Sequence, residues 1–140
     1  MNIAIKKTVP TAKIPARAHD TDAAYDLYAV SPQGSIWLHP GERHLFDTGI
    51  SMSIPKGYYG HICDRSGNAL KKGLTVLGGI VDSGYFGSVG VILLNAGREV
   101  VEITDGFKIA QIIFKKHETP EMIEVTDLGD SERENNLDVS

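Results

Sequence analysis

The sequence predicts an all-β fold, either a sandwich or a barrel. Turn sequences recur at short intervals, with SPQG from residue 31, HPGE from 39, IPKG from 54, NAG from 95 and TDG from 104. The segments between these turns are short and rich in Ile, Val, Leu and aromatic residues, as β-strands are. A single segment has a helical pattern, which excludes a helical bundle.

The apolar segments of the first half of the chain each end at a turn. Residues 3–7 are the first such segment, and the next two flank the SPQG turn. A longer segment lies between HPGE and IPKG, and another follows IPKG. The expected strands are therefore 3–7, 25–30, 35–38, 44–54 and 58–64.

The predicted helix comes next in the chain. SGNALKKG, residues 66–73, begins with Ser, contains good helix formers and ends with Gly, so we expect at most about two helical turns. Apolar segments separated by glycine-containing turns then resume. The expected strands of the second half are 75–81, 89–95, 99–103 and 108–114.

Length and composition indicate one globular domain. The chain has 140 residues, of which 41% are hydrophobic and 23% charged. No apolar run approaches the roughly 18 residues of a membrane span, so no membrane partner is expected. We expect a β domain over residues 1–126. Residues 127–140, DLGDSERENNLDVS, are polar without a core-forming period and are expected to be a mobile tail.

Charge and cysteine content indicate which partners and which compartment to expect. The formal net charge of −4 argues against a nucleic-acid partner. The N-terminal MNIAIKKTVP does not have the pattern of a secretory signal, and the single cysteine, Cys63, cannot form an internal disulfide. A reduced, cytoplasmic compartment is therefore expected. The five histidines show no zinc-site spacing.

The segment DRSGNALKKG, residues 64–73, could bind phosphate. The first free N–H groups of a short helix point the same way, and Arg65 and Ser66 stand at its start. Lys71 or Lys72 could add a positive charge. The alternative is a capped surface helix with solvated lysines, and spacing alone does not decide between them.

Two acidic segments are candidates for chemistry. DTDAAYDLYA contains three acids, and an acidic cluster can hold magnesium through water. Asp26 lies within an apolar alternation, whereas Asp20 and Asp22 have the pattern of a solvated loop. In GGIVDSGYFG, Asp82 is a single carboxylate followed three residues later by Tyr85, among glycines that leave backbone uncovered. An aromatic ring beside an acid suits a nucleoside, but DSG also has the composition of a hairpin turn.

One polar residue interrupts the apolar run GFKIAQIIF, residues 106–114. A buried strand tolerates Gln111 only if the amide is hydrogen-bonded. The amide could bond to backbone or point at a ligand, and both alternatives remain open.

These segments together resemble the trimeric all-β deoxyuridine triphosphatase (dUTPase) family. The matching motifs, in order, are AAYDLYA, RSGNALKKG, GGIVDSGYFGSVG and KIAQIIF, and the resemblance covers residues 10–133. It implies a β-clip, a jelly-roll-like distorted barrel, assembled as a homotrimer with active sites between subunits. It also implies hydrolysis of dUTP to dUMP and pyrophosphate with Mg²⁺ as the cofactor, in the cytoplasm or, for a viral protein, the host cytoplasm.

The resemblance also implies roles for individual residues. Asp82 activates the water that attacks the α-phosphate, and Tyr85 lies against the deoxyribose and excludes a 2′-hydroxyl. Backbone groups of residues 74–79 bind the uracil edge, with Leu77 and Gly79 among them. Asp26 supports Mg²⁺ indirectly, through water. The residues that bind phosphate are Arg65, Ser66, Gly67, Lys71, Gln111 and Arg133.

The chain departs from the family pattern at several positions. Lys108 stands where the family often has Arg, which keeps the charge and loses the bidentate geometry. Gly84 and Phe86 replace charged residues of the third motif. In the family, a glycine-rich C-terminal segment with an aromatic residue closes over the bound nucleotide. The tail of this chain has Ser131 and Arg133 but neither the glycines nor the aromatic residue, so the resemblance does not extend to that closing segment.

Two other functions compete with a dUTPase. A dCTP deaminase shares the fold, but its catalytic Glu in the strand after the third motif has no counterpart in VGVILLN, residues 89–95. A dUTPase-like nucleotide-binding or regulatory protein with weak catalysis would explain the unusual tail. The presence of Arg65, Asp82 and Tyr85 favours the enzyme.

Overall fold

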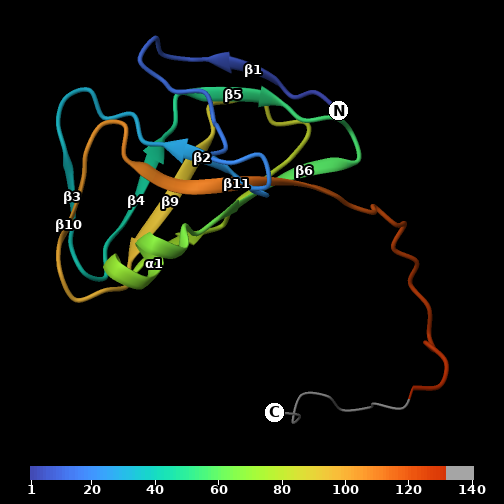
Figure 1. Ribbon diagram of the computed structural model, residues 1–140. Coiled ribbons are helices and arrows are strands. Elements are labelled where there is room, and N and C mark those ends of the chain that lie inside the picture. The colour runs from blue at the N-terminus through green and yellow to red at the C-terminus, as the bar shows by residue number, and fades with distance from the viewer. Residues whose placement is uncertain (132–140) are drawn as a thin grey trace.

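The computed structural model describes residues 1–131 and confirms an all-β fold with one short helix (Figure 1). The first six strands are β1 (Ala4–Lys7), β2 (Tyr25–Tyr28), β3 (Ile36–Leu38), β4 (Arg43–Asp47), β5 (Ile50–Ser53) and β6 (Tyr58–Cys63). Helix α1 (Ser66–Lys72) follows. The remaining strands are β7 (Leu74–Leu77), β8 (Ile80–Val81), β9 (Gly90–Asn95), β10 (Val101–Ile103) and β11 (Lys108–Lys116).

The strands of the described residues form four antiparallel sheets rather than one closed barrel. The largest has the order β2-β11-β6-β8, and a second has the order β4-β9-β7. Two-stranded sheets pair β1 with β5 and β3 with β10. Figure 1 shows β11 lying between β2 and β6, with α1 at one end of the sheets.

The core lies between these sheets and is continuous. β9 alternates in the expected way, with Val91 and Leu93 buried and Ile92 outside. β11 contributes Ile109 and Ile112, which are fully buried. Burying an aliphatic side chain of this size stabilises the fold by about 1.5–3 kcal/mol, so the apolar segments that predicted the strands also hold them together.

Two predicted strands are each divided in two, which corrects the expected strands 44–54 and 75–81. Gly49 has φ +66°, outside the extended region, and separates β4 from β5. Gly78 and Gly79 have φ +74° and +108° and separate β7 from β8. The chain thereby passes from the sheet of β9 to the sheet of β6.

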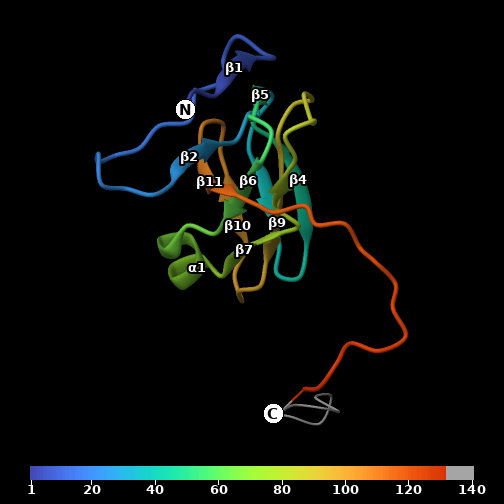
Figure 2. The ribbon, with the colours of Figure 1, turned by 90° about the vertical axis from the view of Figure 1, so that its right-hand side faces the viewer.

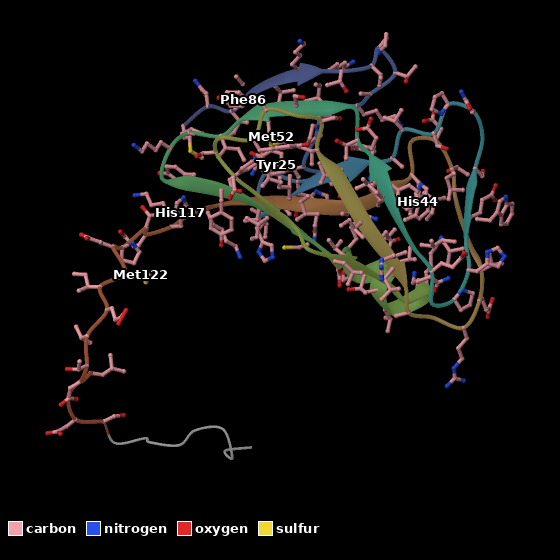
Figure 3. All side chains as sticks on the ribbon, turned by 180° about the vertical axis from the view of Figure 1, so that it is seen from behind. Tyr25, His44, Met52, Phe86, His117 and Met122 are labelled. Atoms are coloured by element: carbon pink, nitrogen blue, oxygen red, sulfur yellow. The ribbon has the colours of Figure 1, made fainter. Side chains whose placement is uncertain are left out.

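The helix is confirmed at 66–72, and Gly73 ends it by donating its N–H to the carbonyl of Ala69. Residues 117–131 contain no helix or strand and are exposed, and they run away from the sheets (Figures 1 and 2). In Figure 3, Met122 stands on this segment well clear of the body of the protein. Among residues 1–131 there is no helix long and apolar enough to cross a membrane.

Replacing Gly49 with Ala is expected to destabilise the protein by about 3 kcal/mol. The left-handed φ costs roughly 1–2 kcal/mol for a residue with a side chain. A Cβ at this position would also lie 2.7 Å from Val9 Cγ2 and 2.8 Å from the Cβ of Ala12, and such overpacking typically costs about 1–3 kcal/mol. Gly41→Ala is the control, because Gly41 has φ +82° and open space around it. Equal losses in free energy of unfolding by urea would show that packing around Gly49 contributes nothing.

Candidate active site

The register of the largest sheet brings three distant segments together. Gln111 of β11 lies opposite Asp26 of β2 and opposite Cys63 of β6. The chain leaves β6 at Cys63 and continues through Asp64 and Arg65 into α1. Three of the segments singled out in the sequence therefore meet at one end of this sheet.

Asp26 holds two cations side by side. Its Oδ1 accepts a hydrogen bond from Arg65 Nε at 3.1 Å, and its Oδ2 lies 3.5 Å from Lys108 Nζ. The Asp26 side chain is 14% exposed and the Arg65 side chain 31%, so both are shielded without being enclosed. We call Asp26, Arg65 and Lys108 the Arg65 cluster. Its net charge of about +1 and the forked geometry of Arg suit an anion with several oxygens.

The start of α1 adds backbone donors beside this cluster. Arg65 precedes the helix in an extended conformation, and no side chain caps the first turn. Ser66 lies inside the helix and does not cap it, whereas Gly73 caps the other end. Asn68 is buried, and its amide donates to the carbonyl of Lys108 at 2.9 Å, which fixes the helix to β11. Ser66 and Gly67 are exposed, with their N–H groups in the first turn.

Asp64 is a residue whose contribution the sequence analysis missed. Its carboxylate accepts the Val76 N–H at 2.6 Å and the Thr75 hydroxyl at 2.8 Å. Its carbonyl accepts the side-chain amide of Gln111 at 2.8 Å, so the amide of Gln111 is bonded to backbone. Asp64, directly after β6, thus joins the end of β6 to β7 and β11. The available signal was an acid placed directly before Arg65 at the end of a predicted strand.

A second group of predicted residues surrounds a pocket of about 370 Å³. Gly79, Asp82 and Tyr85 of the third motif all line it, together with Leu77 from the expected uracil-binding residues 74–79. Pockets of this size are large enough for a small-molecule ligand. Asp82 is exposed at its rim.

The loop after Asp82 begins with a turn, but the hairpin alternative is wrong. The Tyr85 N–H donates to the Asp82 carbonyl at 3.1 Å, which closes the turn. The strands on either side do not pair with each other, because β8 pairs with β6 whereas β9 pairs with β4 and β7. The turn instead carries the chain between two sheets.

The wall of the Asp82 pocket is apolar and largely uncovered. Leu45 and Ile92 face each other across β4 and β9 and are 64% and 38% exposed. Ile80, on β8, is 60% exposed. Exposed aliphatic side chains gathered in this way are typical of a surface that another molecule covers.

The predicted residues do not meet around one cavity in a single chain. Of the residues that the structure describes, neither Asp26, Arg65 nor Gln111 lines the Asp82 pocket. Lys71 lies in the last turn of α1, beside a different pocket that Arg98 and Glu99 also line. Arg133 lies outside the described residues.

Within residues 1–131, the site does not supply enough ligands to hold a metal ion by itself. Residues 1–131 contain no group of three His, Cys, Asp or Glu side chains that could hold a metal ion. Both oxygens of Asp26 already face cationic groups. A metal that arrives with the oxygen ligands of a polyphosphate would fit the residues present here.

Sequence comparison relates the chain to enzymes of nucleotide metabolism. A family model described as dUTPase matches residues 10–137. The chain is 42% identical over 138 residues to a deoxyuridine 5′-triphosphate nucleotidohydrolase of Clostridium novyi, a match that covers 97% of this chain and 95% of that protein. It is also 42% identical over 127 residues to the protein of the same name from Monkeypox virus, covering 91% and 82% of the two chains.

Comparison with solved structures also relates the chain to dUTPases. A mutant dUTPase of phage phi11 of S. aureus, described for the coordination of a structural Mg(II) ion, superposes with a TM-score of 0.83 at 26% identity. That match covers 91% of this chain and 99% of that one. A mutant dUTPase of Staphylococcus bacteriophage 80alpha with dUpNHpp gives a TM-score of 0.82 at 26% identity, covering 92% and 99%.

Asp64→Ala is expected to lower the free energy of unfolding by about 2 kcal/mol, because it leaves the partly buried Val76 N–H without its acceptor. Asp64→Asn keeps one acceptor oxygen and should lose less than half as much. Urea unfolding at a fixed protein concentration measures both. Equal losses in the two variants would contradict a role for the hydrogen bond to Val76.

Proposed function

The chain belongs to the dUTPase family, whose members hydrolyse dUTP, and we propose that it does so by attack of an Asp82-activated water on the α-phosphate. The observation that carries this proposal is that Asp82 and Tyr85 share one pocket with Leu77 and Gly79. An acid, an aromatic ring and bare backbone in one cavity suit a nucleoside whose phosphate lies next to the acid.

The base and the sugar occupy the Asp82 pocket in this proposal. Backbone groups near Leu77 and Gly79 hydrogen-bond the uracil edge, where the narrow space disfavours the 5-methyl group of thymine. The ring of Tyr85 lies against the deoxyribose and leaves no room for a 2′-hydroxyl. Backbone groups and one aromatic ring can bind a nucleoside without basic side chains. This mode of binding is therefore compatible with a protein of net charge −4.

The phosphates extend to the Arg65 cluster. The Arg65 guanidinium and the N–H groups of Ser66 and Gly67 donate to phosphate oxygens. Gln111 keeps its bond to Asp64 through one amide hydrogen and has a second that can reach a phosphate. Lys71 and Arg133 belong to the same set in the family pattern, and in this proposal partner chains supply them to the phosphates.

Mg²⁺ is the proposed cofactor, held mainly by the triphosphate, with Asp26 as a water-mediated contact. When bound, it offsets phosphate charge and stabilises the negative charge that develops during phosphoryl transfer. Asp26 has a second task that needs no metal, because it holds Arg65 and Lys108 in place for the phosphates.

Asp82 acts as the general base. Its carboxylate orients a water molecule and accepts a proton from it as the water oxygen attacks the α-phosphorus. The new bond forms in line with the bond from the α-phosphorus to the bridging oxygen, which breaks. The products are dUMP and pyrophosphate, and the proton passes from Asp82 to solvent.

We propose a homotrimer in which each active site takes the Asp82 pocket from one chain and the Arg65 cluster from another. Two observations support it. The pocket and the cluster do not share a cavity within one chain. The wall formed by Leu45, Ile80 and Ile92 is exposed and apolar, as a subunit contact requires.

Asp82→Asn should bind dUTP with near-normal affinity and lose catalysis by about 100-fold or more, because the amide cannot accept a proton from water. A pyrophosphate-release assay with calorimetry on a non-hydrolysable dUTP analogue measures both. Asp20→Asn, in an exposed loop, is the control. Undiminished turnover in the Asp82 variant would refute the assignment. Tight binding without turnover by the unmodified protein would instead favour a nucleotide-binding regulator.

Mixing two inactive variants tests the shared site. Asp82→Asn and Arg65→Ala, unfolded and refolded together, form mixed trimers in which about a quarter of the sites combine an intact Asp82 with an intact Arg65 from different chains. Activity should recover to about that fraction of the unmodified level. If both residues served the same site from one chain, no site would be restored and the mixture would stay inactive.

A further inference from the structure

We propose that Gly87, Ser88 and Asp47 are positioning residues that hold the Tyr85 ring against its own loop and so set the selectivity for deoxyribose over ribose. This inference rests on the proposed function. It concerns contacts within the loop that follows Asp82.

The Tyr85 ring lies across the backbone of Gly87. A Cβ built on Gly87 would lie 2.6 Å from Tyr85 Oη, 2.8 Å from Cζ and 3.0 Å from Cε1. Distances this short cannot persist, so any side chain at residue 87 would push the ring away. The φ of Gly87 is not in the left-handed region, so the backbone itself does not require glycine here. The glycine provides space for the ring.

Hydrogen bonds fix the far end of the ring. The Tyr85 hydroxyl donates to the Ser88 carbonyl at 2.7 Å. The Ser88 hydroxyl in turn donates to the Asp47 carboxylate, which also accepts the Gly49 N–H at 2.9 Å. Asp47 ends β4, so this chain of contacts ties the loop to a strand of the β4-β9-β7 sheet.

These contacts matter because packing alone does not hold Tyr85. Tyr85 is 47% exposed and lines the Asp82 pocket. A half-exposed ring without anchors would rotate among staggered conformations and could swing aside to admit a 2′-hydroxyl. With the hydroxyl end of the ring against Gly87 and the hydroxyl bonded to Ser88, the ring is already in place before substrate binds, so the sugar must fit the ring.

The loop offers a matched pair of substitutions. Gly87→Ala displaces the ring with no backbone penalty, whereas Gly84→Ala, in the same loop, adds a Cβ that meets nothing within 4 Å. For each variant, kcat/KM is measured with dUTP and with UTP, beside Tyr85→Ala, which lacks the ring. Gly87→Ala should raise the UTP-to-dUTP ratio of kcat/KM by about tenfold or more, toward that of Tyr85→Ala, and Gly84→Ala should stay within about twofold of the unmodified enzyme.

Ser88 supplies an independent test if Gly87→Ala does not fold. Ser88→Ala removes the link to Asp47 and should raise the ratio by roughly fivefold, whereas Ser88→Thr keeps the hydroxyl and should restore selectivity. If Tyr85→Ala loses selectivity and neither Gly87→Ala nor Ser88→Ala does, the positioning role is wrong and the proposed function stands. If the unmodified protein does not hydrolyse dUTP, the proposed function is wrong and this inference fails with it.

Discussion

The antiparallel register of β11 between β2 and β6 is the constraint on which the Arg65 cluster depends. It sets Gln111 opposite Asp26 and Cys63, so that Arg65, two residues beyond Cys63, reaches the Asp26 carboxylate. Side chains alternate along a strand, so a slip of one residue would turn Gln111 toward the core and expose Ile112. The burial of Ile112 therefore fixes the register, and a purely apolar contact determines where the cations lie.

Local sequence patterns predicted most of this fold because short apolar segments and turn residues report directly on strands and their ends. They did not reveal where a strand breaks. Gly49, Gly78 and Gly79 lie next to or within apolar runs that predicted continuous strands, and only their positive φ values show that the chain changes sheet there. The sign of φ depends on what the neighbouring strands require, which is information from the tertiary structure.

The candidate site was predictable to a similar extent. The third motif indicated a ligand site with an acid beside an aromatic ring, and the structure brings Asp82, Tyr85 and Gly79 together around one pocket. The contacts of Asp64 were not predictable, because an acid before Arg65 has the same appearance whether it faces solvent or accepts the Val76 N–H. The separation of the pocket from the Arg65 cluster was also beyond local patterns, since it depends on which sheet each strand joins.

In the proposed trimer, assembly and catalysis are linked because Asp82 and the apolar wall beside it are both exposed in a single chain. Asp82 lies at the rim of its pocket, and the apolar wall beside it, with Leu45 and Ile80, faces solvent. A carboxylate in bulk water does not hold the attacking molecule in one orientation, whereas a site that excludes bulk water strengthens its hydrogen bonds and orients that molecule. In the proposed trimer, the contact that covers the apolar wall also brings the phosphate-binding cations to the pocket. The same buried surface would then stabilise the assembly and create the conditions for attack, so a free subunit would be inactive although it carries every residue that the mechanism needs.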